Sequence, residues 1–237
     1  MSAVTDILIQ KAAPFGITFT DAQLERFSKY ASFLLDWSSR MNLTAIKDDE
    51  GIAVKHFLDS ILLTHEVPIE KGARLIDVGS GAGFPGVPVK IMREDMSITL
   101  ADSTNKRITF LTELLKELGL SGEAVHTRAE DFGNNKGYRE CYDIATARAV
   151  AHLRELSEYC LPFVKVGGIF AAMKSGNIDV ELEESQRAIK TLGGRVEEIK
   201  RFTLHDAGER SIVVIKKISQ TPTGYPRTGA KMAKYPL

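Results

Sequence analysis

A dense run of glycines directly follows a short, apolar, strand-like segment. The segment reads Leu75-Ile76-Asp77-Val78, and the next eight residues are GSGAGFPG. Glycine tolerates positive φ and allows another group to pack against bare backbone. The run therefore indicates either a tight turn from a strand into a helix or a site where a ligand approaches the main chain.

From residue 72 onward, β-rich segments alternate with helical ones. The expected strands are 73–78, 97–101, 123–127, 143–147, 168–174, 195–203 and 210–217. The expected helices between them are 86–93, 105–118, 151–159 and 179–192. This alternation predicts an α/β fold with a doubly wound, mostly parallel sheet. The last two strands are joined only by a loop with Gly208, so they should form an antiparallel hairpin at the sheet edge. The tail after residue 218, rich in Pro, Gly and cations, is expected to be irregular.

The first part of the chain has a different pattern. Residues 1 to about 66 are expected to be helical, and Thr20 is placed to cap a helix with apolar side chains at helical spacing. A second amphipathic stretch runs from about Asp49 to Leu63. The predicted organisation is a helical region over 1–66 and a Rossmann-like domain over 67–237.

Composition limits the function classes. Lys and Arg together number 31, as do Asp and Glu, so the formal net charge is zero and any nucleic-acid surface must be a local patch. Cys141 and Cys160 lack metal-ligand spacing, which favours two reduced thiols and no metal site. The chain starts without a signal-peptide pattern and has no apolar run of membrane-spanning length. We therefore expect a cytoplasmic protein without membrane contacts.

The residues around the glycine run favour a nucleoside ligand. No Gly-Lys-Ser/Thr follows, so a phosphate-binding P-loop is unsupported, and the spacing is not the Gly-x-Gly-x-x-Gly of dinucleotide sites. Asp102 ends the next expected strand, where a carboxylate can accept hydrogen bonds from ribose hydroxyls. Asp77, inside its strand, must be satisfied by hydrogen bonds, and we favour backbone amides of the turn as its partners.

The chain resembles the RsmG family, also called glucose-inhibited division protein B. The resemblance rests on DVGSGAGFPG, ADSTNKRITFL, TRAEDF, ATARAVAHL and the upstream HFLDS, and it covers nearly the whole chain. It implies a class I S-adenosylmethionine-dependent methyltransferase with a seven-stranded sheet and an N-terminal helical extension. It also implies methylation of a guanine N7 in the 530 loop of 16S ribosomal RNA, with S-adenosylhomocysteine as product and the small ribosomal subunit as partner.

The resemblance also implies residues that contact the methyl donor. The expected cofactor contacts are Gly79, Gly81, Gly83, Phe84, Asp102, Ser103, Thr104, Ala129, Glu130 and Arg148. A carboxylate such as that of Glu130 can accept from the exocyclic amine of adenine, and a backbone amide beside it can bond a ring nitrogen.

Guanine N7 carries a lone pair at neutral pH, so the reaction needs alignment of the reactants more than a general base. The expected catalytic residue is Arg148, just past a strand. Its guanidinium can pair with the donor carboxylate, guanine O6 or an RNA phosphate. The alternative is a salt bridge to Glu130 or Asp143.

Six residues are candidates for RNA binding: His56, Asp59, Lys106, Arg107, Lys174 and Arg227. His56 and Asp59 share one helical face, which lies over the catalytic mouth or else forms a helix–helix hydrogen bond. The alternative for Lys106 and Arg107 is a solvated position at the start of a helix, and the alternative for Lys174 is a solvated strand end. Arg227, between Tyr225 and Tyr235, matches the ending of the family, and arginines beside aromatic rings can stack on splayed bases.

Two other functions compete with an RNA methyltransferase. One is a non-catalytic ribosome-assembly or nucleoside-sensing module that retains the pocket; an intact loop, Asp102 and Arg148 favour the enzyme. The other is a nicotinamide oxidoreductase, which the missing dinucleotide spacing opposes. We expect the protein to be a monomer.

Overall fold

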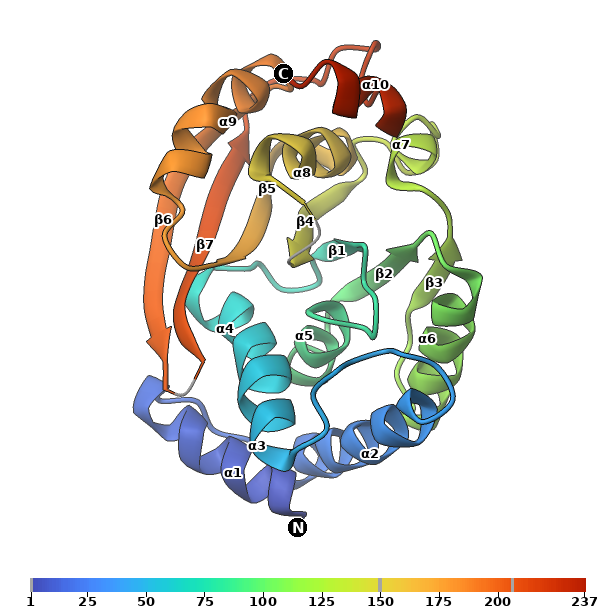
Figure 1. Cartoon of the computed structure of the whole chain (residues 1–237), viewed down its shortest axis with the longest axis vertical. Coiled ribbons are helices and arrows are strands. Elements are labelled where there is room, and N and C mark those ends of the chain that lie inside the picture. The colour runs from blue at the N-terminus through green and yellow to red at the C-terminus, as the bar shows by residue number, and fades with distance from the viewer. Residues whose placement is uncertain (1, 149–150, 206) are drawn as a thin grey trace.

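A single seven-stranded sheet organises the protein (Figure 1). The computed structural model describes residues 2–148, 151–205 and 207–237. The strands are β1 (Arg74–Val78), β2 (Ser97–Asp102), β3 (Glu123–His126), β4 (Tyr142–Arg148), β5 (Val164–Ser175), β6 (Gly194–Leu204) and β7 (Gly208–Lys217). Their order is β3-β2-β1-β4-β5-β7-β6. Strands β1 to β5 run parallel to one another, whereas β7 is antiparallel to both β5 and β6. The predicted doubly wound sheet with an antiparallel edge hairpin is confirmed.

Both faces of the sheet are covered, and alternate residues of each strand supply two separate hydrophobic clusters. In β1, Leu75 belongs to one cluster, whereas Ile76 and Val78 belong to the other. Because side chains alternate across a strand, a sheet buried on both faces needs a nearly continuous apolar sequence, which the central strands have. The helices that follow the strands are α5 (Gly86–Met92), α6 (Asn105–Glu117), α7 (Ala129–Phe132), α8 (Leu153–Cys160) and α9 (Asp179–Thr191), with a 3₁₀ turn η3 (Leu161–Phe163).

The N-terminal helices cover the face of the sheet that also carries α5 and α6. They are α1 (Ala3–Ala12), the 3₁₀ turn η1 (Ala13–Phe15), α2 (Asp21–Ser38), α3 (Asp49–Gly51), the π-helical turn η2 (Ile52–Leu58) and α4 (Asp59–Glu66). Thr20 caps α2 as expected, in a capping box with Gln23. Buried Phe27, Phe57 and Leu111 belong to one hydrophobic cluster. The division of the chain at residue 66 stays a prediction.

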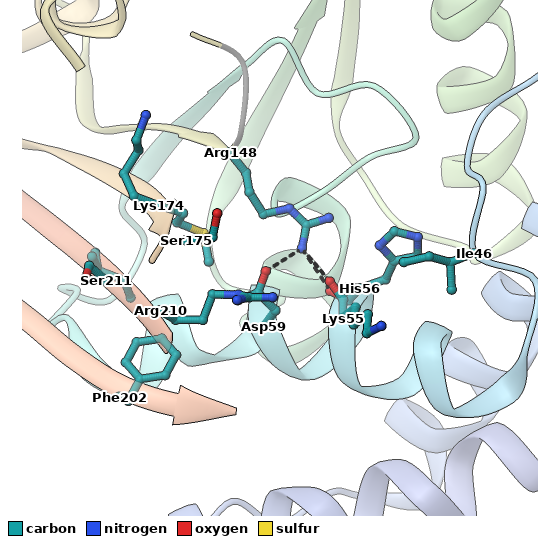
Figure 2. Close-up of a pocket in the computed structure, with 12 residues that line it drawn as sticks. Ile46, Lys55, His56, Asp59, Arg148, Lys174, Ser175, Phe202, Arg210 and Ser211 are labelled. Atoms are coloured by element: carbon teal, nitrogen blue, oxygen red, sulfur yellow. Dashed lines mark hydrogen bonds and ion pairs between the residues drawn. The ribbon is translucent and has the colours of Figure 1, made fainter. Parts of the chain in front are cut away.

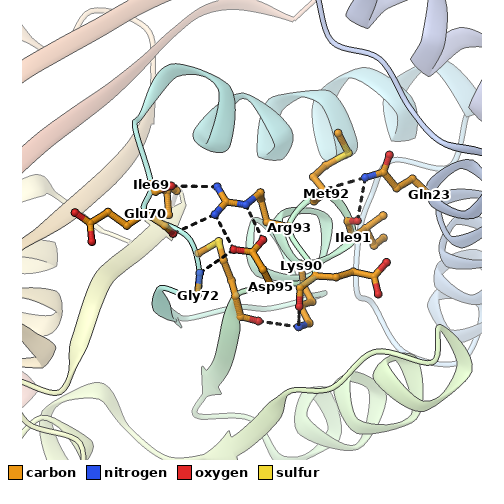
Figure 3. Close-up of polar contacts among 11 residues, drawn as sticks. Gln23, Ile69, Glu70, Gly72, Lys90, Ile91, Met92, Arg93 and Asp95 are labelled. Carbon is orange, nitrogen blue, oxygen red and sulfur yellow. Dashed lines mark hydrogen bonds and ion pairs between the residues drawn. The ribbon is translucent and has the colours of Figure 1, made fainter.

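Polar contacts join the helical region to the amino edge of the sheet (Figure 3). The Gln23 amide of α2 lies 3.4 Å from the Ile91 carbonyl at the end of α5. Beyond that end, Arg93 donates to both oxygens of Asp95, each at 2.8 Å, and Asp95 accepts from the Gly72 amide, also at 2.8 Å. These bonds fix the loops that enter β1 and β2.

The structure corrects the expectation of an irregular tail. Residues Gly229–Lys234 form a short helix, α10, which packs near α7 at the top of Figure 1. A helix this short is marginal in water, so tertiary contacts must hold it, and those contacts leave no periodic signal in the sequence. The helix α7 was likewise not predicted. The helix expected at 151–159 begins later, at Leu153.

Three features of the described ranges concern the cysteines, the metal-binding groups and the helices. Cys141 and Cys160 are free thiols, as expected; Cys160 is buried and Cys141 half-buried. Over the same ranges, no group of three or more His, Cys, Asp or Glu side chains is arranged to hold a metal ion. None of the described helices combines the length and apolar character that crossing a bilayer requires.

Candidate functional site

The glycine run forms the turn between β1 and α5. The amides of Gly79 and Ser80 both donate to the carbonyl of Ala101 in β2, at 2.8 and 3.1 Å. Gly79, Gly81 and Gly83 all have positive φ, between 58° and 95°. Such a backbone favours glycine, so the spacing of the run follows from the conformation of this turn.

Two of the glycines also permit close packing. A Cβ at Gly83 would lie 2.7 Å from the Tyr30 hydroxyl, and one at Gly86 would lie 2.5 Å from a methyl of Leu100. Tyr30 donates to the carbonyl of Ala82 at 2.5 Å. These glycines therefore admit protein neighbours to the backbone, so the N-terminal helices and the sheet hold the turn in place.

Asp77 organises the same turn from below. Its side chain is fully buried, and Oδ2 accepts from the Gly86 amide at 2.9 Å. The predicted structural role of Asp77 is confirmed. Its Oδ1 has no hydrogen-bond partner in the described part of the chain. Burial raises the pKa of this carboxyl to about 7, because an ionised form without enough partners is costly away from water.

Asp102 ends β2 beside the turn and is 4% exposed. Its Oδ2 accepts from the Gly81 amide at 3.0 Å, and its Oδ1 accepts from the Thr104 amide at 2.8 Å. Arg107 of α6 donates to Oδ2 at 3.3 Å. This carboxylate therefore connects the glycine turn to the segment after β2.

A hollow of about 360 Å³ opens at the carboxyl edge of the sheet beside Asp102, and we call it the loop pocket. Its lining comprises Val78, Gly79, Ala101, Asp102, Ser103, Thr127, Arg128, Ala129, Glu130, Ala151, Glu155, Leu156, Tyr159 and Gly229. Five of the ten expected cofactor contacts lie here: Gly79, Asp102, Ser103, Ala129 and Glu130. The other five are outside this lining: Gly81, Gly83, Phe84, Thr104 and Arg148.

Phe84 lies inside the protein, 6% exposed. Its ring stacks on Tyr30, with centroids 5.3 Å apart, and on His56, with centroids 4.4 Å apart. The guanidinium carbon of Arg148 lies 5.0 Å from the centre of the Phe84 ring. Phe84 thus links the glycine turn to the helical face that carries His56 and to Arg148.

Arg148 does not pair with Glu130 or Asp143, the two partners considered from the sequence. Its Nη1 donates to Asp59 Oδ2 at 2.9 Å and to the carbonyl of Lys55 at 3.1 Å (Figure 2). On the other side, Arg210 Nε lies 3.2 Å from Asp59 Oδ1. One carboxylate of the N-terminal region therefore binds two guanidinium groups, from β4 and from β7.

Asp59 and its two arginine partners line a second hollow of about 280 Å³, which we call the arginine pocket (Figure 2). Its lining comprises Ile46, Lys55, His56, Asp59, Arg148, Met173, Lys174, Ser175, Phe202, Arg210, Ser211 and Ile212. Four of these side chains are cations and one is a carboxylate. Burial lowers the pKa of His56 to about 4, so its imidazole is neutral at pH 7. The lining has a positive surplus that suits an anionic group.

The remaining RNA candidates are dispersed. Lys174 lies in the arginine pocket, where its ammonium donates to the Ala151 carbonyl at 2.9 Å and pairs with Glu181 at 2.6 Å. This lysine is therefore paired and not the solvated strand-end residue considered as an alternative. Lys106 is exposed at the start of α6. Arg227 pairs with Glu158 of α8.

The described part of the structure does not contain the helix–helix hydrogen bond that was the alternative for His56 and Asp59, because their partners lie in a loop and in two strands. His56 Nε2 lies 2.8 Å from Thr44 Oγ1, a hydrogen bond within the N-terminal region. Asp59 instead bonds to strands of the sheet, as described above. A role of either residue in RNA binding stays a prediction.

Sequence reasoning missed Arg210, Ser175 and Ser211. Because β7 is antiparallel, its first residues lie at the edge where the parallel strands end, and Arg210 pairs with Ser175 across that edge. The signal was the predicted hairpin itself: reversal of the last strand places its opening residues beside the ends of β4 and β5.

The mostly parallel sheet with its antiparallel edge hairpin, and the two hollows at its carboxyl edge, are the architecture of class I methyltransferases. NSun6 from Pyrococcus horikoshii superimposes with a TM-score of 0.57 at 14% identity, covering 70% of this chain and 53% of that one. A SAM-dependent O-methyltransferase from Thermotoga maritima gives a TM-score of 0.53 at 16% identity, covering 80% and 73% of the two chains. At these identities the likeness concerns the fold, and it confirms the expected fold class.

Sequence comparison identifies the family. Residues 23–213 match the GidB model, described as rRNA small subunit methyltransferase G. Ribosomal RNA small subunit methyltransferase G of Acetivibrio thermocellus is 50% identical over 98% of this chain and 96% of the relative. The Staphylococcus carnosus protein of the same name is 48% identical over 97% of both chains. The chain belongs to this family, as the resemblance predicted.

Proposed function

We propose that the chain transfers a methyl group from S-adenosylmethionine to N7 of a guanine in the 530 loop of 16S ribosomal RNA. The observation that carries the methyltransferase activity is the family match over almost the entire chain. The guanine N7 target follows from the resemblance in the glycine loop and in the segments after β2, β3 and β4. The proposed partner is the small ribosomal subunit, bound by a monomer.

The loop pocket is the proposed donor site, and its lining fits an adenosyl group. Asp102 is placed for the ribose hydroxyls at the end of β2, as carboxylates are in related sheets. Ala129 and Glu130 border the same hollow after β3, and apolar atoms of Ala101 and Leu156 form its walls. When bound, S-adenosylmethionine supplies an electrophilic methyl group on a sulfonium.

The residues of this chain act on the reaction by position. Guanine N7 already has a lone pair, so no residue has to remove a proton. Holding N7 in line with the donor can supply up to roughly 7–11 kcal/mol of the barrier. The half-buried, neutral His56 stacks on Phe84, and the Phe84 ring in turn contacts the Arg148 guanidinium. Arg148 orients the base or an adjacent phosphate through the guanidinium nitrogens that Asp59 leaves available.

The arginine pocket is the proposed approach for the RNA. The two hollows lie on either side of the end of β4, with Arg148 in one and Ala151 in the other. The arginine pocket has the positive surplus that a phosphodiester requires, although the whole chain has none. We propose that the nucleotide to be methylated enters from this side.

Methyl transfer to small ribosomal subunits tests the proposal. Tritiated donor is mixed with subunits that lack the modification, and the site is mapped by primer extension after borohydride–aniline cleavage. The variant Arg148→Ala should lose transfer while its fold survives, because Asp59 keeps its contact with Arg210. Arg187→Ala, an exposed arginine of α9, is the matched control and should remain active.

Two outcomes would contradict the proposal in different ways. Transfer to another nucleotide would reject the 530-loop guanine but leave the enzyme class intact. Donor binding without transfer to any form of the subunit would favour the non-catalytic alternative. Full activity of Arg148→Ala would reject the assigned role of this arginine.

A further inference from the structure

The C-terminal segment ties together the two helices that border the loop pocket. We call residues 221–235 the C-terminal strap. Its helix α10 lies beside α7 and close to α8 in Figure 1. The lining residues Ala129 and Glu130 begin α7, whereas Glu155, Leu156 and Tyr159 belong to α8.

The contact between the strap and α8 is an ion pair removed from water. Glu158 is 1% exposed, and its carboxylate accepts from Arg227 Nε at 2.8 Å and Nη2 at 2.6 Å. The Arg227 amide adds a third bond to Glu158 Oε1 at 2.8 Å. Such a bidentate pair fixes orientation as well as distance. Arg227, expected from the sequence to bind RNA, is therefore bound to Glu158 of α8.

The contact between the strap and α7 uses two side chains that follow this helix. Asn134 Nδ2 donates to the Glu130 carbonyl at 2.9 Å and to the Pro226 carbonyl at 3.1 Å. Arg139 Nη1 donates to the Gly133 carbonyl at 3.0 Å and to the Tyr225 carbonyl at 2.8 Å. The strap and α7 are thus joined through shared donors.

Gly229 brings the strap to the pocket itself. It is part of the pocket lining, and a Cβ placed on it would lie 3.2 Å from Glu130 Oε1 and 3.7 Å from the Tyr159 hydroxyl. A larger side chain would have to displace the Glu130 carboxylate or fill the hollow. The absence of a side chain at Gly229 keeps this wall of the pocket open.

We propose that the C-terminal strap is the adenine-side wall of the donor site, with Gly229 and Arg227 as positioning residues for donor binding and not for RNA binding. The inference rests on the proposed placement of the donor in the loop pocket. Gly229 leaves room beside Glu130, and Arg227 holds the strap and α8 at the spacing that the adenine needs.

The test measures the affinity of the full-length protein for S-adenosylhomocysteine by calorimetry, and for a 530-loop RNA hairpin by filter binding. Gly229→Leu is the main variant, since this position is half-buried and is not among the glycines with positive φ, so the backbone itself accepts a side chain. It should weaken nucleoside binding by at least about tenfold and leave hairpin binding unchanged. Gly224→Leu is the matched control, because a Cβ at Gly224 meets nothing within 4 Å.

Arg227→Gln supplies a second arm, with the melting temperature as a check of the fold. It should also weaken nucleoside binding and leave hairpin binding unchanged. Unchanged nucleoside affinity in Gly229→Leu would overturn the inference, and so would a loss confined to hairpin binding in Arg227→Gln. If the unaltered protein itself fails to bind S-adenosylhomocysteine, the placement of the donor fails first, which distinguishes the two proposals.

Discussion

At the scale of single residues, the candidate site depends on pairs that lie far apart in the sequence. Arg148 and Asp59 are 89 positions apart, so no spacing in the sequence predicts their contact. Each residue could be selected as a candidate from its local motif, but the choice of partner required the fold. The alternatives Glu130 and Asp143 were equally consistent with the sequence and are wrong.

Asp59 should matter more for stability than an exposed carboxylate. The variant Asp59→Asn leaves Arg148 and Arg210 facing each other without their shared counter-charge. Because the carboxylate is 8% exposed and the two guanidinium groups only 15% and 17%, we expect a loss of about 2 kcal/mol in unfolding free energy. Urea denaturation measures it, and methyl transfer should fall with it.

The control for that variant is Asp36→Asn. Asp36 also pairs with an arginine, Arg40, but both side chains are more than half exposed. The expected change is below about 0.5 kcal/mol. Equal losses in the two variants would show that burial adds nothing to the Asp59 cluster.

Asp77 should give the protein a distinctive pH dependence. Its pKa is raised to about 7 in the folded state, against about 3.9 in an unfolded chain. Between these values the folded state binds more protons, so this group lowers stability as the pH rises from about 4 to about 7, and has no further effect above that. The size of the decline is roughly 3–5 kcal/mol.

Asp77→Asn isolates this effect, since its amide oxygen can still accept from the Gly86 amide. Urea midpoints of both proteins are compared across the same pH range. The stability of the Asn variant relative to the native protein should increase with pH. Parallel curves would mean that Asp77 titrates normally despite its burial.

At the scale of elements, the sequence predicted the parts with strong periodicity and missed those held by tertiary contacts. The strands of the central sheet are nearly continuous apolar runs, and the amphipathic helices α6 and α9 were placed within a residue or two. The short helices α7 and α10 were not predicted, because tertiary contacts of the flanking residues, such as the bond from Asn134 to the Pro226 carbonyl, replace intrinsic helix stability. The π-helical turn η2 also has no signature in the pattern of apolar residues.

The anchoring of α2 can be separated into two contributions through Gln23. Its Oε1 accepts from the Thr20 amide at 2.9 Å in the capping box, and its Nε2 lies against the last carbonyls of α5. Gln23→Ala removes both and should cost about 1 kcal/mol of unfolding free energy. Gln23→Glu retains the acceptor for Thr20 and loses only the donor, so its cost should be smaller.

Thermal or urea unfolding of the two variants gives the answer, with Thr18→Ala as the control for an exposed side chain just before the helix. A larger loss in Gln23→Glu than in Gln23→Ala would mean that repulsion at the α5 terminus, and not capping, dominates at this position.

At the scale of the whole molecule, positive charge is concentrated in one place although the chain carries no net excess of it. The net charge is zero, yet Lys55, Arg148, Lys174 and Arg210 converge on one hollow at the carboxyl edge of the sheet. Composition alone could exclude a general attraction to polyanions. It could not locate the patch, because these residues come from four separate parts of the chain.

This arrangement predicts how RNA binding should respond to salt. Each contacted phosphate of a single strand contributes a slope of about −0.7 to the plot of log affinity against log salt concentration. Lys55 is exposed at the rim of the arginine pocket. Lys55→Ala should therefore make the slope for a 530-loop hairpin shallower by about 0.7.

Lys71→Ala, at the opposite edge of the sheet, should leave the slope unchanged, because Lys71 lines a different hollow beside Gly72 and Lys165. Filter binding at several salt concentrations gives both slopes. A shallower slope in Lys71→Ala alone would place the RNA on the amino edge and reject the arginine pocket as its approach.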